Sequence, residues 1–105
     1  MSDRRKREMA AAFEKLGHLF LAGVPFLQAV RVAADECRDR AVANALREIH
    51  RRVSIRQRVD DVLSEFGDTF PVSVQLLWKV GQKRDLEQCC LRIASILRAE
   101  TSGQP

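Results

Sequence analysis

Apolar residues recur along most of this 105-residue chain three or four positions apart, which is the spacing of an amphipathic helix. No segment shows the strict alternation of apolar and polar residues that is typical of a strand. We therefore predict an all-α protein, a single compact bundle of about six short antiparallel helices. The expected helices cover about residues 3–21, 25–37, 40–53, 55–66, 71–80 and 84–98.

Each expected helix has an apolar face that we predict to point into the core. These faces contain Met9, Phe13, Leu16 and Phe20 in the first helix, Leu27, Val30, Ala34 and Cys37 in the second, Val42, Leu46, Ile49 and Val53 in the third, Val59, Val62, Leu63 and Phe66 in the fourth, and Leu86, Cys89, Cys90, Ile93, Ile96 and Leu97 in the sixth. The fifth helix is short and mostly apolar, so we expect it to be central and to end at Gly81. Its Trp78 is predicted to lie in the core, with an exposed interface anchor as the alternative.

The stretch LAGVPFLQAV, residues 21–30, interrupts the helical pattern. Gly23 can adopt the left-handed conformation that ends a helix. Pro25 suits the first turn of the next helix, because its ring presets the backbone angle and its missing N–H has no partner there. We therefore predict a tight corner at this point, with the first two helices packed antiparallel.

Two later breaks are expected. The apolar pattern drifts near Ser54, and serine is a good helix cap, so the third and fourth helices are predicted to separate there. In the segment FGDTFP, Gly67 is expected to end a helix, Asp68 or Thr69 to cap the next, and Pro71 to lie in its first turn.

The length suits one domain, residues 1–105, with a helical core over about 9–98 and a flexible tail over 99–105. Hydrophobic residues make up 46% and charged residues 30%, as in soluble globular proteins. No apolar run approaches the roughly 20 residues needed to span a bilayer. The charged N-terminus also lacks the apolar stretch of a secretory signal. We expect a cytoplasmic location, or one at the cytoplasmic face of a membrane.

Few side chains are candidates for chemistry. The histidines and cysteines are His18, His50, Cys37, Cys89 and Cys90. The cysteines show no metal-ligand spacing and are expected to be reduced, small buried hydrophobes. Surface or structural roles are expected for both histidines, and the consecutive Asp60 and Asp61 diverge on a helix and form no catalytic pair. We expect a protein that is not an enzyme and has no metal, cofactor or small-molecule substrate.

The chain is mildly basic, with a formal net charge of +4, and several arginines gather around the expected third-to-fourth helix junction. The arginines in this interval are Arg47, Arg51, Arg52, Arg56 and Arg58, and Glu48 is the only acid among them. Guanidinium groups suit bidentate contacts with carboxylate or phosphate. Arg51, Arg52, Arg56 and Arg58 are therefore candidate partner-binding residues, with an ordinary solvated face as the alternative.

DNA binding is the alternative function. It requires a recognition helix with exposed polar side chains after a tight turn, which the segment Arg56–Arg58 could begin. Asp60, Asp61 and Glu65 follow at once on the same expected helix and would repel phosphate. A nucleic-acid partner is therefore the less favoured expectation.

The segment LGHLFLAGVPFLQAVRVAADE resembles the opening of the F-type domain of type II secretion, the cytoplasmic module of the platform protein in secretion systems and type IV pili. The matching residues are Leu21, Ala22, Gly23, Val24, Pro25, Phe26, Leu27, Ala29 and Val30. Later matches are Val59, Val62 and Leu63, then Phe70-Pro71, then Gly81 with Leu86 and Leu91. The similarity covers about residues 13 to 98, and its turn residues are Gly23, Pro25, Phe70, Pro71 and Gly81.

This resemblance implies a non-enzymatic protein–protein interaction module at the cytoplasmic face of the inner membrane. Domains of this type contact the assembly ATPase and neighbouring platform components, self-associate, and meet the membrane only peripherally. The family glycine near Arg56 is replaced, the usual late glutamate is Gln82, and the second glycine of that turn is missing. Any ion-binding role of the acidic position is therefore not carried over. Family members continue into transmembrane helices that this sequence does not contain, so we expect a stand-alone domain, a piece of a longer protein, or a diverged relative.

Overall fold

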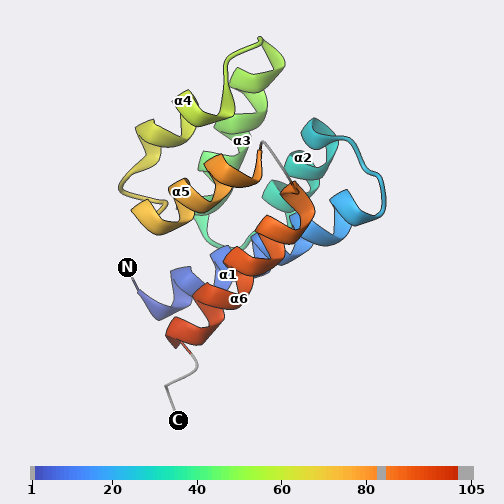
Figure 1. The fold of residues 1–105 in the computed structure, drawn as a ribbon. Coiled ribbons are helices and arrows are strands. Elements are labelled where there is room, and N and C mark those ends of the chain that lie inside the picture. Colours follow the sequence, from blue (N-terminus) through green and yellow to red (C-terminus); the bar gives the residue numbers. More distant parts are fainter. Residues whose placement is uncertain (1, 83–84, 102–105) are drawn as a thin grey trace.

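The computed structural model describes residues 2–82 and 85–101, and all regular structure in these residues is helical (Figure 1). The helices are α1 (Asp3–Leu21), α2 (Phe26–Glu36), α3 (Arg40–Ser54), α4 (Val59–Leu63) with the 3-10 turn η1 (Ser64–Phe66), α5 (Val72–Gly81) and α6 (Leu86–Thr101). The predicted all-α bundle is confirmed, and the bounds predicted for the first helix match those of α1.

Helices α1 and α6 form the longest packed pair, and they run antiparallel (Figure 1). Lys6, near the start of α1, forms an ion pair of 3.2 Å with Glu100, near the end of α6. At the other end of the pair, a Cβ added to Gly17 would lie 2.7 Å from the side chain of Leu91. The missing side chain at Gly17 is what allows the two helices to approach closely there.

The corner between α1 and α2 forms as predicted. Gly23 has φ +83°, its N–H bonds the carbonyl of Phe20, and the N–H of Val24 bonds the carbonyl of Leu19. This pair of bonds is a Schellman motif, the common helix ending that requires a left-handed residue. Pro25 stands at the N-cap, one residue before α2 begins, rather than in the first turn of the helix as predicted.

The two helices joined by this corner pack antiparallel, which confirms the second part of the prediction. The rings of Phe20 and Phe26 stack 5.8 Å apart beside the corner. Farther from it, Lys15 forms an ion pair of 3.5 Å with Glu36.

Aromatic side chains fill the middle of the core. Trp78 is fully buried, and its ring meets Phe13 and Phe70 edge to face at centroid distances of 5.0 and 6.2 Å. Such contacts are worth about 0.5–1.5 kcal/mol beyond the buried area. The prediction that Trp78 belongs to the core is confirmed, and the alternative of an exposed anchor is wrong.

The expected start of the fourth helix near Ile55 is wrong by four residues, because α4 begins at Val59. Arg56 has φ +71°, a left-handed conformation that no helix can contain, so the chain turns there. Ser54 does not cap the next helix. It is the last residue of α3, and its hydroxyl donates a 2.6 Å hydrogen bond to the carbonyl of Arg51.

The capping predicted for the fifth helix is also wrong. Neither Asp68 nor Thr69 caps α5, since Pro71 occupies the N-cap position, where no side chain bonds the helix. The amide of Gln75 instead reaches back and donates to the carbonyl of Phe70 at 2.8 Å. Gly67 does follow the last residue of η1, but with φ −59°, so its special backbone freedom is not used.

Helix α5 is not central. Its Val74 and Trp78 are buried, but Val72, Leu76 and Val80 are 69%, 58% and 59% exposed. The helix contacts α6 and α4, between which it lies in Figure 1, and the side that carries these three residues is exposed. The apolar composition of this helix predicted that it would be buried on all sides. Its neighbours cover only part of its surface, so that prediction is wrong.

The last helix is longer than predicted. Helix α6 ends at Thr101 rather than Arg98, and the Thr101 hydroxyl donates to the Arg98 carbonyl at 2.9 Å. The residues 99–101 of the expected flexible tail are thus helical. The expected helix start at Arg84 and the rest of the tail, residues 102–105, lie outside the described residues.

Candidate docking surface

The arginine-rich junction is a second Schellman corner, between α3 and α4. The N–H of Arg56 bonds the carbonyl of Val53 at 2.9 Å, and the N–H of Gln57 bonds the carbonyl of Arg52 at 3.0 Å. The pattern repeats that at Gly23, but here an arginine holds the left-handed position. The sequence shows that the family glycine is replaced near this residue, but the left-handed conformation was not predicted from it.

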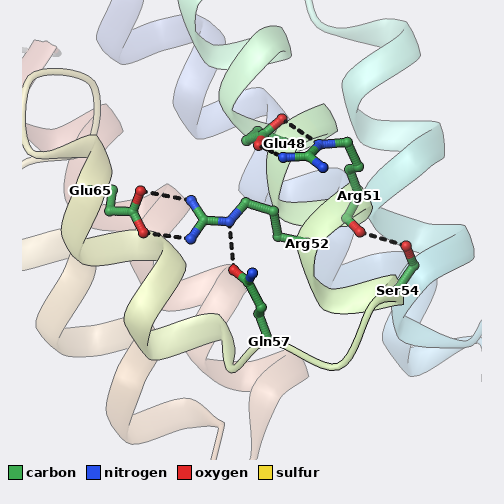
Figure 2. A network of polar contacts seen from close by, with 6 residues as sticks. All are labelled: Glu48, Arg51, Arg52, Ser54, Gln57 and Glu65. Atoms are coloured by element: carbon green, nitrogen blue, oxygen red, sulfur yellow. Dashed lines mark hydrogen bonds and ion pairs between the residues drawn. The ribbon is translucent and has the colours of Figure 1, made fainter.

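Arg52 clamps this corner to the next elements (Figure 2). Its two terminal nitrogens donate to the two carboxylate oxygens of Glu65 at 2.7 and 2.6 Å, and its Nε donates to the side-chain oxygen of Gln57 at 2.6 Å. The hydrogen bonds from Arg52 hold the pKa of Glu65 below its usual range. This side chain thus ties α3 to η1 and to the turn between them.

The other arginines of the junction differ in their exposure and in whether a carboxylate pairs with them. Arg51 is paired with Glu48 on the same face of α3, and this hydrogen bond lowers the pKa of Glu48 (Figure 2). Arg58 lies 3.8 Å from a carboxylate oxygen of Asp60, and its side chain is 74% exposed. Arg56 is exposed, and no described carboxylate lies within ion-pair distance of it.

The structure therefore brings the four predicted partner-binding residues to one corner and gives them unequal surroundings. Along the sequence, Glu48 is the only acid between Arg47 and Arg58. Arg47 in fact lies 3.6 Å from Asp35 of α2. Asp35 and Glu65 come from other elements to meet Arg47 and Arg52, and only folding brings these pairs together. Asp60, in contrast, is two positions from its partner Arg58 in the sequence.

The cysteines and histidines form no evident chemical site. Cys90 is buried, whereas Cys37 and Cys89 are only partly buried, and burial raises the pKa of all three thiols. His18 is exposed and His50 is partly buried. Within residues 2–82 and 85–101, no group of three or more histidine, cysteine or acidic side chains is arranged to hold a metal ion.

Comparison with protein families shows which family the chain belongs to. The family model described as type II secretion system (T2SS), protein F, matches residues 12–103, nearly the whole chain. The chain belongs to this family. No curated protein sequence matches it.

Family membership marks the chain as a domain of the platform proteins of secretion and pilus systems, and it implies interaction with secretion-system components. The platform proteins of the type II secretion protein F family reside in the inner membrane. Among the described residues of this member, none of the helices has the length and apolar character needed to cross a bilayer.

Proposed function

We propose that the chain is a non-enzymatic docking module that binds the assembly ATPase or another platform component of a type II secretion or type IV pilus system, at the cytoplasmic face of the inner membrane. The match to the protein F family over residues 12–103 is the observation that carries this proposal. The fold supports it, because α1 packs on both α6 and α2, and α2 in turn packs on α3. The α3–α4 corner is therefore held on a packed set of helices.

We place the contact at the α3–α4 corner, where the four candidate arginines divide into two roles. Arg52 shapes the corner through Glu65 and Gln57. Arg51, Arg56 and Arg58 are the contact residues, because their side chains are exposed. The Arg51–Glu48 pair is largely exposed, and exposed pairs contribute only about 0.2–1 kcal/mol, so a partner carboxylate can replace Glu48 at little cost. The side chain of Asp60 is only 15% exposed, so Arg58 is expected to keep this neighbour when it meets a partner.

The experiment is a pull-down of the ATPase from the same secretion system with the double variant Arg56→Glu and Arg58→Glu. Binding is expected to fall at least about tenfold, and to weaken further as salt rises, because exposed charges act mainly through association. The matched control is Arg31→Glu with Arg40→Glu, which changes the net charge equally at exposed positions of α2 and α3. Equal binding by both double variants would contradict the placement of the contact.

The DNA-binding alternative has no observation in its favour. Asp60 and Asp61 lie in the first turn of α4, directly after the segment Arg56–Arg58, and would repel phosphate there. The neighbouring Arg52 is paired with Glu65. A gel shift with random duplex DNA at low salt checks this, because backbone-driven binding is strongest there.

A further inference from the structure

An apolar stripe runs along the exposed side of α5. The described part of the chain has five large, strongly exposed apolar side chains, Leu21, Ile55, Val72, Leu76 and Val80. The last three are four positions apart, so they line one side of α5 over about 12 Å. We call these three residues the α5 stripe. Single exposed apolar residues are common on protein surfaces, whereas contiguous ones mark binding sites.

A groove of about 480 Å³ adjoins the stripe, between α5 and α6. Its lining includes Leu77 and Val80 from α5 and Cys89, Leu91 and Arg92 from α6. Stripe and groove share Val80 and therefore form one surface, on the two neighbouring helices coloured in shades of orange in Figure 1.

The floor of the groove is well defined, because the two helices touch closely at Gly81. A Cβ added there would lie 2.5 Å from both the Cβ and the sulfur of Cys89. The Cys89 thiol also donates to the carbonyl of Leu77 at 2.7 Å. These contacts fix α5 against α6, so the groove is a preformed feature of the pair.

Positive charge flanks this surface. Successive side chains of a helix point about 100° apart, which places Lys79 at one edge of the α5 stripe and Leu77 at the other. Leu77 faces the groove. Arg92 lies on the α6 side of the groove. Both cations are exposed, and no described carboxylate lies within ion-pair distance of either. Asp85 also lines the groove and keeps its negative charge while its carboxylate accepts from the N–H of Gln88, so two cations and one acid among the described residues border this surface.

We propose that this surface binds one amphipathic helix of a partner protein, whose apolar ridge lies along the α5 stripe and whose flanking acidic side chains meet Lys79 and Arg92. Helix-in-groove recognition uses apolar anchors at the three- and four-residue spacing that the stripe presents. A second copy of the chain fits less well, since its own α5 would bring another Lys79 to the surface and each copy has a net charge of +4.

The inference rests on the docking function proposed above and names a second surface for it. It concerns α5 and α6 rather than Arg56 and Arg58, so its failure is distinguishable from failure of the ATPase pull-down. A chain that binds the ATPase but no acidic helix would retain the proposed function and lose this inference.

The test uses two synthetic helical peptides of about 20 residues with the same leucine ridge, one flanked by glutamates and the other by lysines. Binding to the whole chain is measured by fluorescence anisotropy at low salt. The glutamate peptide is expected to bind saturably and at least about tenfold more tightly than the lysine peptide, because only its charges complement the flanks.

Two variants locate the binding. Leu76→Gln with Val80→Gln should weaken binding of the glutamate peptide by about tenfold or more, with an unchanged helical circular dichroism signal, since both side chains are exposed. Leu21→Gln with Ile55→Gln removes equally exposed apolar groups elsewhere and should leave binding unchanged. Absence of saturable binding, equal affinity for both peptides, or equal loss in both variants would overturn the proposal. So would concentration-dependent dimerisation that the first variant abolishes, because the occupant would then be a second copy.

Discussion

The two Schellman corners of the molecule have the same backbone hydrogen bonds and different means of specifying them. At the α1–α2 corner, Gly23 adopts φ +83° without a side chain to clash. At the α3–α4 corner, Arg56 adopts φ +71°, which costs a non-glycine residue about 1–2 kcal/mol. The second corner therefore needs other interactions to offset this strain.

The residues that follow each left-handed position show where that support comes from. Val24 packs partly buried against the core, the apolar contact that commonly completes this motif. Gln57, at the equivalent place, accepts a hydrogen bond from Arg52, which is itself held by Glu65. The first corner is specified by glycine and packing, and the second by a polar clamp that lies beside exposed guanidinium groups.

The largest expected effect breaks the first corner. Gly23→Val should destabilise the chain by about 1–3 kcal/mol, through backbone strain alone, because no atom lies within 4 Å of an added Cβ. Chemical denaturation measures the change. Ala22→Val is the control, since Ala22 has φ −79° and tolerates a branched side chain without that strain, so an equal loss there would refute the assignment.

The reciprocal change relieves the second corner. Arg56→Gly should stabilise the chain by about 0.5–1 kcal/mol, because glycine removes the left-handed strain. Part of this gain is offset, because glycine also raises the conformational entropy of the unfolded chain. The same denaturation experiment detects it. Gly23→Arg provides the opposite exchange and should destabilise. A loss of stability in Arg56→Gly would mean that the arginine side chain contributes more than its backbone conformation costs.

Removal of the clamp tests why Arg56 is tolerated. Arg52→Gln should lower the melting temperature, by less than Gly23→Val, because it separates α3 from Glu65 and Gln57. Arg51→Gln should change it little, since the exposed Arg51–Glu48 pair lies within one helix. Charge reversal at Arg52 is accordingly expected to cost stability. If Arg52→Gln and Arg51→Gln lowered the melting temperature equally, the Arg52 clamp would not be what stabilises this corner.

The smallest expected effect is on pH dependence. Hydrogen bonds from Arg52 and Arg51 lower the pKa of Glu65 and Glu48, so each carboxylate contributes stability that is present above its unfolded pKa of about 4.3. That contribution is lost as pH falls through the lower folded pKa. Melting curves between pH 7 and acid should therefore show a shallower decline for Arg52→Gln than for the parent chain. Parallel declines would contradict the assigned pairing of Glu65.

Local signals predicted much of the fold. The apolar spacing and the Gly-x-Pro sequence predicted α1 and its corner, because residues within one turn determine both. No such signal marks Arg56, whose left-handed backbone depends on contacts with residues on either side of the turn. Asp39, almost fully buried, caps α3 by accepting from the N–H of Val42, a role not predicted from the sequence.

The candidate surfaces depended even more on tertiary contacts. The sequence predicted a cluster of arginines, but the pair between Arg52 and Glu65 joins positions 13 apart and forms only once η1 turns back on α3. The apolar residues of α5 were recognised, but not that Val72 and Leu76 face solvent. Apolar spacing shows that a face exists, and only the packed helices show whether this chain or a partner covers it.

The central claim is that the polar-clamped corner is the docking surface, and hydrogen exchange with and without the secretion ATPase tests it most directly. The account predicts that the partner slows exchange of the backbone amides over residues 55–58, while amides over residues 22–24 at the glycine corner exchange as in the free chain. Slower exchange at the glycine corner alone, or at neither corner in the presence of bound ATPase, would contradict it.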